Sequence, residues 1–595
     1  MRPTDEQAQA IDAYLSGESL RIEALAGTGK TTTLKMLVRS GSPRGGKIVY
    51  TSFAKKVVAD AKSSFPASCR VATNHSLAWA VGRRYQEKGR LQPRVTPHDV
   101  TSRLGWSDAR FGGGDARACA YAALRAVEVF CQSAADAIGP AHAGDATLRM
   151  ARNDPPRAAN PLPFVVDAAG ELWAEMVNPV GTMPVTHDVY LKEWTLGNPR
   201  IAATTILLDE AQDSNPLLVH VLQRQTGTQL VIVGDRRQAI YGFRGSVDSM
   251  DAFGIDKTVH LTQSFRFGPE IAEVANAILA DQCDSGVLLR GDPNQPGRVG
   301  PIPAPTCFLA RTNASLVAQL VNLQDRTPNL RVGVVGGVSD LIKLVEGADA
   351  LQCGVPTNHP DLQMFRDWSM VKQASEGDGY SHLRTLVSLV ETYGTSALTG
   401  SLNRIRGNED LPAACDVMLS TAHKAKGAEF EAVRMVDDFT APGPRNNREL
   451  TGWKPEDGNL LYVAVTRARK QLDCLGVAAV QASLPGDFAG YRAGPEPNPD
   501  APGDTFSDAG LPDPGLEFVA IDDDSLVPGV YPHPLFKGGE VEVAVDGSCT
   551  FVEVRVGGLT IFRAQGTATV GPETGGLRPV TIGCAELHVP SAAVG

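Results

Sequence analysis

The sequence lacks the features that define several protein classes. In its 595 residues no run approaches the ~18 uninterrupted apolar residues of a membrane-spanning helix, which excludes an integral membrane protein. The N-terminus has no apolar stretch of a secretory signal. The ten cysteines are scattered and no two form a CxxC pair, which excludes a zinc ribbon and an iron–sulfur framework. Free thiols fit a reducing cytosol, so we expect a cytoplasmic protein with no membrane partner.

Basic residues are fewer than acidic ones, 56 against 67, and the net charge is −11. Much of the acidic excess lies between Asp487 and Asp524, where ten acidic residues accompany one base, Arg492. That segment carries −9, which leaves −2 for the rest of the chain. Because the local field matters more than the sum of charges, a nearly neutral body can still hold a basic groove. The net charge therefore does not exclude a nucleic-acid partner.

Helix and strand patterns alternate near the N-terminus. A helix is predicted over Glu6–Leu15, and a short strand over Leu20–Ala24 ends in a glycine-rich turn before a helix that starts at Lys30. Strand, turn, helix and strand in this order are typical of a parallel sheet with crossover helices. Further strands of the same buried type are predicted at Lys47–Ser52, Thr204–Leu208 and Gln229–Val233.

A second α/β pattern begins near His260. Its helices alternate with strands predicted at Cys307–Ala310, Arg331–Val335, Val417–Ser420, Ala432–Val436 and Leu472–Val477. The stretch 337–408 interrupts this pattern and is expected to be helical and polar. After a linker rich in Pro, Gly and Asp, the segments from Glu540 onward alternate apolar and polar residues around glycine turns. This alternation predicts a small β module.

The strongest single motif lies between the first predicted strand and helix. Residues 24–31 read Ala-Leu-Ala-Gly-Thr-Gly-Lys-Thr, a P-loop in which Ala24 replaces the first glycine. Consecutive backbone N–H groups at a helix N-terminus cradle phosphates, Lys30 reaches the β- and γ-phosphates, and Thr31 helps to hold Mg²⁺. A glycine-rich turn without a ligand is the weaker interpretation, given the Lys-Thr pair and the flanking elements. The residues predicted to bind nucleotide here are Ala26, Gly27, Thr28, Gly29, Lys30, Thr31 and Thr32.

Two adjacent carboxylates, Asp209 and Glu210, end another predicted strand. Holding two such groups together is costly unless a cation or a proton-transfer role compensates. In P-loop enzymes the first carboxylate assists Mg²⁺ and the second orients and deprotonates the attacking water. Behind a P-loop the pair therefore predicts nucleotide hydrolysis, with ATP and Mg²⁺ as cofactors.

These carboxylates begin the run Asp-Glu-Ala-Gln-Asp at 209–213, and a second distinctive run occupies Val233–Gly245. Together they resemble superfamily 1 helicases of the UvrD/Rep/PcrA group. The other motifs of that family follow in order at Tyr50–Lys55, Thr73–Ser76, Leu261–Arg266, Leu309–Asn313, Ser420–Phe430 and Leu461–Arg469. This order makes coincidence negligible. The first two motifs resemble most the short, F-box-helicase-like or phage-type branch.

The resemblance assigns further residues to the nucleotide. Gln7 would read adenine, Phe265 would stack on it, and Glu429 would accept a hydrogen bond from the ribose. Gln238 would sense the γ-phosphate. Charge developing on the transferred phosphoryl group would be neutralised by two arginines of the second sheet, as arginine fingers do; they are Arg266 and Arg467.

A second group of residues is assigned to single-stranded DNA. Tyr241, Phe243 and Arg244 directly follow Gln238, and aromatic rings stack on bases regardless of sequence while arginine attracts phosphate. The family usually carries tryptophan where Phe243 stands. Core packing of these rings is the alternative. The remaining predicted DNA contacts are Phe53, Lys55, Thr73, His75 and His423.

The resemblance implies an α/β fold with two RecA-like P-loop NTPase domains, helical insertions and the C-terminal β module. Residues 1–85 and 196–258 would form the first RecA-like domain, with 86–195 inserted as subdomain 1B. Residues 259–336 and 409–486 would form the second, with 337–408 as a reduced 2B insertion. An acidic linker at 487–515 would lead to an accessory domain at 516–595, a candidate docking site for a protein partner.

The activity implied by the resemblance is that of an ATP-dependent DNA helicase. It would move 3′→5′ on single-stranded DNA, act at ss/ds junctions and couple ATP hydrolysis to unwinding. The interval between Arg311 and Thr421 is much shorter than in the large bacterial repair helicases, so the duplex contacts of their 2B domain do not transfer. Two alternatives therefore stay open: a translocase that displaces bound proteins with little unwinding, and an ATP-switched subunit of a phage-defence or replication complex.

Overall fold

The chain divides into two compact units, Met1–Pro502 and Gly503–Gly595. The computed structural model describes residues 2–108, 116–144, 162–240, 249–280, 287–363, 365–376, 383–405, 415–440 and 455–484, together with the strands between 529 and 590. In this described part, no helix is both long enough and apolar enough to cross a membrane.

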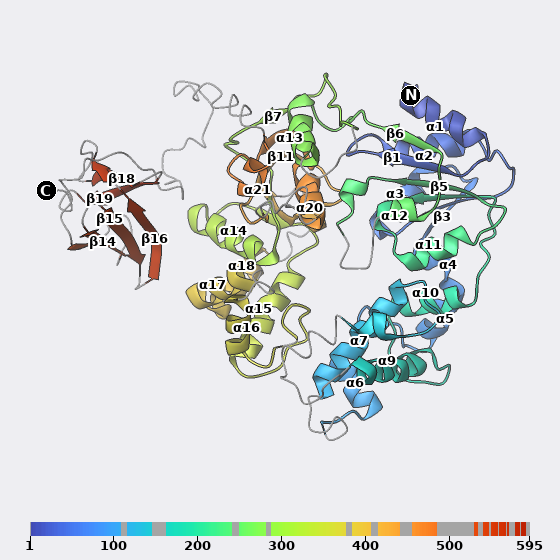
Figure 1. The fold of residues 1–595 in the computed structure, drawn as a ribbon, viewed down its shortest axis with the longest axis horizontal. Helices are drawn as coiled ribbons and strands as arrows, with labels where there is room; N and C mark the ends of the chain where they lie inside the picture. The colour runs from blue at the N-terminus through green and yellow to red at the C-terminus, as the bar shows by residue number, and fades with distance from the viewer. Residues whose placement is uncertain are drawn as a thin grey trace. The chain divides into compact units, whose positions relative to one another are not determined.

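Six parallel strands form the first sheet, in the order β3-β2-β4-β5-β1-β6 (Figure 1). The strands are β1 Leu20–Ala24, β2 Ile48–Ser52, β3 Cys69–Thr73, β4 Thr205–Asp209, β5 Gln229–Gly234 and β6 Thr258–Leu261. The four strands that the sequence predicts here are confirmed. β2, β4 and β5 are buried along their whole length, as strands of a parallel sheet covered on both faces require, whereas β1 alternates buried residues with half-buried Arg21 and Glu23. β6 lies across the expected boundary between residues 258 and 259, because it pairs with β1.

Helices cover the faces of this sheet. They are α1 Asp5–Leu15, α2 Lys30–Arg39, α3 Lys55–Ser64 and α11 Pro216–Gln223, with the short helices η1 Ala211–Asp213, η2 Arg236–Gln238 and α12 Ser249–Ala252. α1 begins at a capping box in which Thr4 and Gln7 satisfy each other's backbone N–H groups. The carboxyl ends of the parallel strands meet at one edge, where β1 enters the glycine-rich turn, β2 leads to Phe53 and β4 to Glu210. Ligand sites of open α/β sheets lie at this edge.

A helical group follows β3. It consists of α4 Asn74–Leu77, α5 Trp79–Glu87, α6 Pro97–Leu104, α7 Ala116–Gln132, α9 Leu162–Val177 and α10 His187–Leu196. All of these helices except α4 contribute to one hydrophobic core, in which α7 places small residues such as Ala120, Ala123 and Ala126. The group occupies most of the predicted 1B insertion.

The second sheet is also parallel and six-stranded, in the order β7-β12-β11-β8-β10-β9. Its strands are β7 Arg298–Val299, β8 Cys307–Ala310, β9 Val332–Val334, β10 Val417–Thr421, β11 Phe430–Met435 and β12 Ala468–Asp473. The prediction of the last strand at Leu472–Val477 was wrong: the strand begins at Ala468 and runs through exposed Arg469 and Lys470, whose polar side chains hid it. The flanking helices are α13 Pro269–Ala280, α14 Asn313–Arg326, α19 Ala422–Ala425, α20 Pro455–Val465 and α21 Ala478–Gln481.

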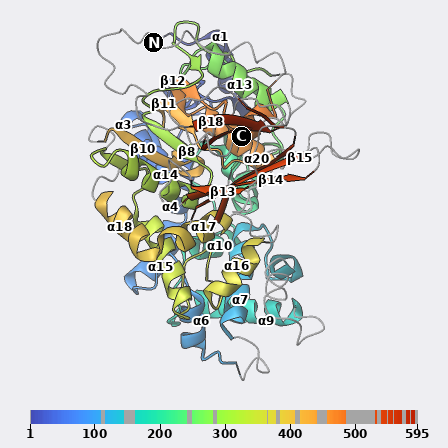
Figure 2. The ribbon, with the colours of Figure 1, turned by 90° about the vertical axis from the view of Figure 1, so that its left-hand side faces the viewer.

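The insertion between β9 and β10 is helical, as predicted, but it is not simply polar. Its helices are α15 Ser339–Gln352, α16 Trp368–Glu376, α17 Arg384–Tyr393 and α18 Thr395–Ile405. Leu344, Leu386 and Leu398 are buried in one hydrophobic cluster with Leu320 of α14, and these helices form a single group (Figure 2). The insertion is thus built onto the second sheet's own helical layer.

The C-terminal unit is antiparallel, in agreement with the predicted β module. One sheet has the order β13-β14-β15-β16 and a second has β17-β18-β19. The strands are β13 Gly529–Pro532, β14 Gly539–Asp546, β15 Cys549–Val556, β16 Leu559–Gly566, β17 Ala568–Val570, β18 Leu577–Ile582 and β19 Ala585–Pro590.

Candidate nucleotide and DNA site

The turn between β1 and α2 has the backbone of a phosphate-binding loop. Gly27 and Gly29 have φ angles of 75° and 80°, in the left-handed region that favours glycine. A Cβ atom on Gly27 would also collide with Ser264 and Arg266, so the loop passes close to the segment after β6. Lys30 Nζ donates to the carbonyl oxygen of Ala24 at 3.1 Å, which places its charge inside the loop.

The carboxylates of Asp209 and Glu210 stand beside this loop. Tyr50 donates its hydroxyl to Asp209 Oδ2 at 2.7 Å, and the Glu210 N–H donates to Asp209 Oδ1 at 3.0 Å. Glu210 has φ 54° and ψ 45°, a left-handed conformation that is costly for a residue with a side chain and clusters at active sites. Gln212 donates its side-chain N–H to the carboxylate of Glu210.

The two carboxyl groups differ in acidity. Burial, aided by the adjacent Glu210 charge, raises the pKa of Asp209 to about 6. Burial also acts to raise the pKa of Glu210, but the charges of Lys30 and Lys426 outweigh it and hold that pKa below its ordinary value. Glu210 is therefore ionised at neutral pH, as a general base must be.

This arrangement fits a magnesium ion. Mg²⁺ in nucleotide sites binds one or two carboxylates together with substrate phosphates and water, and it needs no cage of protein ligands. The Asp209 carboxylate is only 1% exposed, and a cation beside it would offset the cost of its buried charge. Thr31 lies in the first turn of α2, next to Lys30. Asp209 and Thr31 would hold the ion.

A hydrogen-bond chain connects the loop after β5 to the P-loop. Asp235 Oδ2 accepts from Gln238 Nε2 at 2.8 Å and from the Tyr462 hydroxyl at 3.3 Å. The same hydroxyl accepts from the Ala26 N–H at 3.1 Å. Tyr462 belongs to α20, so a residue of the second sheet's layer joins two loops of the first. Tyr462 lies in the predicted motif Leu461–Arg469, but its own role could not be predicted, because a tyrosine on a buried helix has no distinctive spacing.

Both predicted arginine fingers are held by contacts within the second sheet's layer, although Arg266 itself follows β6 of the first sheet. Arg467 is 1% exposed and donates to the carbonyl oxygens of Val463 and Ala428 and to the Thr466 hydroxyl. Burial, and then the nearby Arg266, lower the pKa of Arg467 to about 9, so it remains cationic at neutral pH. Arg266 donates to Glu429 Oε1 at 2.7 Å. Their predicted contacts with a phosphoryl group stay predictions.

The predicted adenine contacts converge on Gly29. Gln7 Nε2 and the Phe265 ring are the groups nearest to a Cβ atom built on that glycine, at 3.4 and 3.7 Å. Gln7 is buried and donates to the Thr33 hydroxyl at 3.3 Å, whereas the Phe265 ring is 46% exposed. Glu6 fixes this arrangement, because its carboxylate accepts from the Thr262 hydroxyl and N–H.

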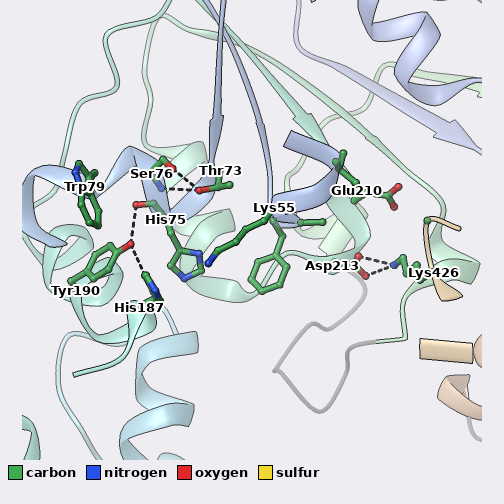
Figure 3. Close-up of a pocket in the computed structure, with 14 residues that line it drawn as sticks. Lys55, Thr73, His75, Ser76, Trp79, His187, Tyr190, Glu210, Asp213 and Lys426 are labelled. Carbon is green, nitrogen blue, oxygen red and sulfur yellow. Dashed lines mark hydrogen bonds and ion pairs between the residues drawn. The ribbon is translucent and has the colours of Figure 1, made fainter. Parts of the chain in front are cut away.

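Four predicted DNA contacts line one pocket of about 440 Å³ (Figure 3). Phe53 and Lys55 come from the end of β2 and the start of α3, and Thr73 and His75 from the turn after β3. Glu210 lines the same pocket, as do residues to which the sequence assigned no role: Trp79, His187, Tyr190, Asp213 and Lys426. His423 lies on α19 and is not among the lining residues. Tyr241, Phe243 and Arg244 lie outside the described residues.

Lys426 crosses from the second sheet's layer to the first. Its Nζ donates to both carboxylate oxygens of Asp213, at 2.6 and 2.8 Å, and to the Gln238 carbonyl oxygen at 2.6 Å. Both side chains of the pair are less than a tenth exposed. Burial raises the pKa of Asp213 to about 6, although the Lys426 charge opposes this rise. The Lys426 ammonium group thus contacts the segment that follows β4, at Asp213, and the segment that follows β5, at Gln238.

A P-loop, a neighbouring acidic pair and two parallel six-stranded sheets define a P-loop NTPase with two RecA-like domains. An AAA domain matches residues 7–244, and a UvrD-like helicase C-terminal domain matches residues 345–474. The chain belongs to the UvrD-like helicases of superfamily 1.

Individual relatives agree with this family. F-box DNA helicase 1 of Gallus gallus is 30% identical over 517 residues, which cover 79% of this chain and 48% of that protein. F-box DNA helicase protein 1 of Schizosaccharomyces pombe is 28% identical over 511 residues, 79% of this chain and 57% of that protein. DNA helicase II of Escherichia coli is 36% identical over 102 residues, 16% of this chain and 14% of that protein. The chain spans about half the length of the two F-box helicases.

Proposed function

We propose that this protein is an ATP-dependent DNA helicase that moves 3′→5′ on single-stranded DNA and couples ATP hydrolysis to duplex unwinding. One observation carries the proposal: Glu210, the candidate base for hydrolysis, lines the same pocket as the predicted DNA contacts Phe53, Lys55, Thr73 and His75. The names of the relatives, which are DNA helicases, support the choice of substrate.

The chemistry follows from the acidity of the site. Glu210 accepts a proton from the water that attacks the γ-phosphate, and the bond to the leaving ADP oxygen breaks. Lys30 binds the β- and γ-phosphates within the loop whose backbone it already contacts. Magnesium, held by Asp209 and Thr31, would neutralise charge on these phosphates. Arg467, cationic and buried near Glu210, neutralises charge that develops in the transition state.

Coupling to DNA runs through contacts between the two sheets' layers. Lys426 holds Asp213 and Gln238, and Tyr462 holds Ala26 and Asp235, so a change at the γ-phosphate moves both layers together. ATP binding closes the cleft and hydrolysis reopens it, and the DNA grips of the two domains alternate. Each cycle then advances the protein along the strand.

Unwinding of tailed duplexes tests this function. The full-length protein with ATP and Mg²⁺ should unwind a duplex with a 3′ single-stranded tail in preference to one with a 5′ tail. ATPase activity should rise when unlabelled single-stranded DNA is added. Preference for the 5′ tail would overturn the polarity, and ATPase that ignores DNA would favour an ATP-switched subunit.

A second candidate is a translocase that displaces bound proteins but unwinds poorly. The compact insertion favours it, because Leu344, Leu386 and Leu398 share one core with Leu320 of α14. An insertion packed in this way lacks a core of its own on which to swing as a separate domain. Displacement of streptavidin from a biotinylated single strand, without unwinding of a 3′-tailed duplex, would establish this candidate instead.

A further inference from the structure

One end of the pocket is formed by aromatic side chains outside every helicase motif. Trp79 opens α5, and His187 and Tyr190 lie on the first turn of α10 (Figure 3). The Trp79 and Tyr190 rings meet edge to face, with centroids 6.2 Å apart. Trp79 is 39% exposed, although a large apolar ring is usually buried. An indole face at the rim of a pocket is therefore the feature to be explained.

The rings around Trp79 are fixed before any ligand arrives. The Tyr190 hydroxyl is 3.0 Å from His187 Nδ1, and His75 Nε2 is 2.9 Å from Asp188 Oδ1. Gly82 of α5 lies against the Tyr190 ring, and a Cβ atom there would come within 2.9 Å of it. A pocket whose side chains are already ordered loses little conformational entropy when a ligand binds.

The pocket is continuous with the predicted DNA path. His75, a predicted DNA contact, packs near both His187 and Tyr190, at centroid distances of 5.8 and 6.2 Å. Lys55 lines the pocket and supplies positive charge for a phosphate. Burial, followed by the charges of His75 and Lys55, lowers the pKa of His187, so its ring is neutral at pH 7. The volume of about 440 Å³ is within the range of sites that enclose small ligands.

We propose that Trp79, His187 and Tyr190 form a nucleobase pocket that extends the single-strand path from β3 and α3 onto α5 and α10. The proposal rests on the function proposed above. One unpaired base of the DNA strand enters the pocket and stacks on the Trp79 indole, while Lys55 attracts the neighbouring phosphate. Stacking on an aromatic face is tolerant of sequence, as a translocating protein requires.

The test measures the affinity of the full-length protein for fluorescent single-stranded oligonucleotides by anisotropy. Trp79→Ala should weaken binding about 5- to 150-fold, the loss expected for one base–aromatic stack. Trp79→Phe, which keeps a flat ring, should bind nearly as wild type, whereas Trp79→Leu should bind as weakly as Trp79→Ala. Phe164→Ala is the matched control: this ring on α9 is 41% exposed, does not line the pocket, and should leave affinity unchanged.

An abasic oligomer of the same length separates stacking from indirect effects. Trp79→Ala should bind this sugar–phosphate strand as well as wild type does, because there is no base to lose. Equal losses on normal and abasic strands, or wild-type affinity of Trp79→Ala for normal DNA, would overturn the nucleobase pocket. Wild-type protein whose ATPase ignores single-stranded DNA would instead overturn the proposed function, whatever the variants do.

Discussion

The substitution Asp209→Asn should make the protein more stable at neutral pH while it disables the site. The wild-type carboxylate is buried, and its pKa lies near 6 instead of at its ordinary value of 3.8. The folded state therefore holds the proton more tightly than the unfolded state does. Above about pH 6 the folded protein carries the full cost of the buried charge, and below about pH 4 it carries none.

The size of this effect follows from the pKa. A rise from 3.8 to about 6 corresponds to about 3 kcal/mol of unfolding free energy at neutral pH. The amide should keep both local hydrogen bonds, since its oxygen can accept from the Glu210 N–H while the Tyr50 hydroxyl turns to accept from its NH₂ group. The melting entropy grows with chain length, and Asp209 lies in the large unit Met1–Pro502. We therefore expect the apparent thermal midpoint to rise by roughly 3 °C at pH 7.5.

The assay is thermal unfolding from pH 4 to pH 8 without nucleotide or Mg²⁺. The advantage of Asp209→Asn should be largest above pH 6 and should shrink toward zero near pH 4. Asp251→Asn is a control of opposite sign, because hydrogen bonds from Arg236 and Arg21 lower the pKa of Asp251 to about 2. Removal of the Asp251 carboxylate should therefore lower the thermal midpoint of the protein above about pH 4. A lower midpoint for Asp209→Asn at pH 7.5, or a difference independent of pH, would refute the reasoning.

Three further predictions concern other parts of the chain. Tyr462→Phe leaves the buried Ala26 N–H without its acceptor, so the protein should lose about 1–3 kcal/mol of stability, seen as a lower thermal midpoint; an unchanged midpoint would contradict this. Tyr241→Ala or Phe243→Ala should each cost about 1–3 kcal/mol of single-strand affinity, whereas lost stability with unchanged affinity would make these rings core residues. Truncation after Ala489 should leave DNA-stimulated ATPase intact, since every predicted nucleotide and DNA residue precedes it; loss of ATPase would make the β module part of the motor.

Most of the two sheets could be predicted because their strands are short apolar runs between turn signals. Leu20–Ala24 matches its prediction residue for residue, because its buried apolar residues alternate with half-buried Arg21 and Glu23 and a glycine-rich turn follows it. β12 was misplaced because Arg469 and Lys470 interrupt its pattern with charge. The second α/β pattern was predicted to begin near His260. That residue instead lies near the end of β6, which pairs with β1 and completes the first sheet.

The site was predictable where chemistry imposes spacing. Lys30 and the Asp209–Glu210 pair stand at fixed distances from glycine turns and strand ends, so the sequence alone assigns them. Trp79 and Tyr190 are single aromatic residues on helices, and only the packing of α5 against α10 brings them to one pocket. Residues that are joined by tertiary contacts leave no local pattern.

The most direct test of the central claim is the turnover of Glu210→Gln in the presence of single-stranded DNA. We propose that Glu210 accepts the proton of the attacking water and that Lys30 binds the phosphates. The variant should therefore bind a fluorescent ATP analogue with near wild-type affinity while DNA-stimulated turnover falls about 100-fold or more. Glu346→Gln, the same change at an exposed position of α15, should leave both quantities unchanged. Near wild-type turnover of Glu210→Gln would contradict the account.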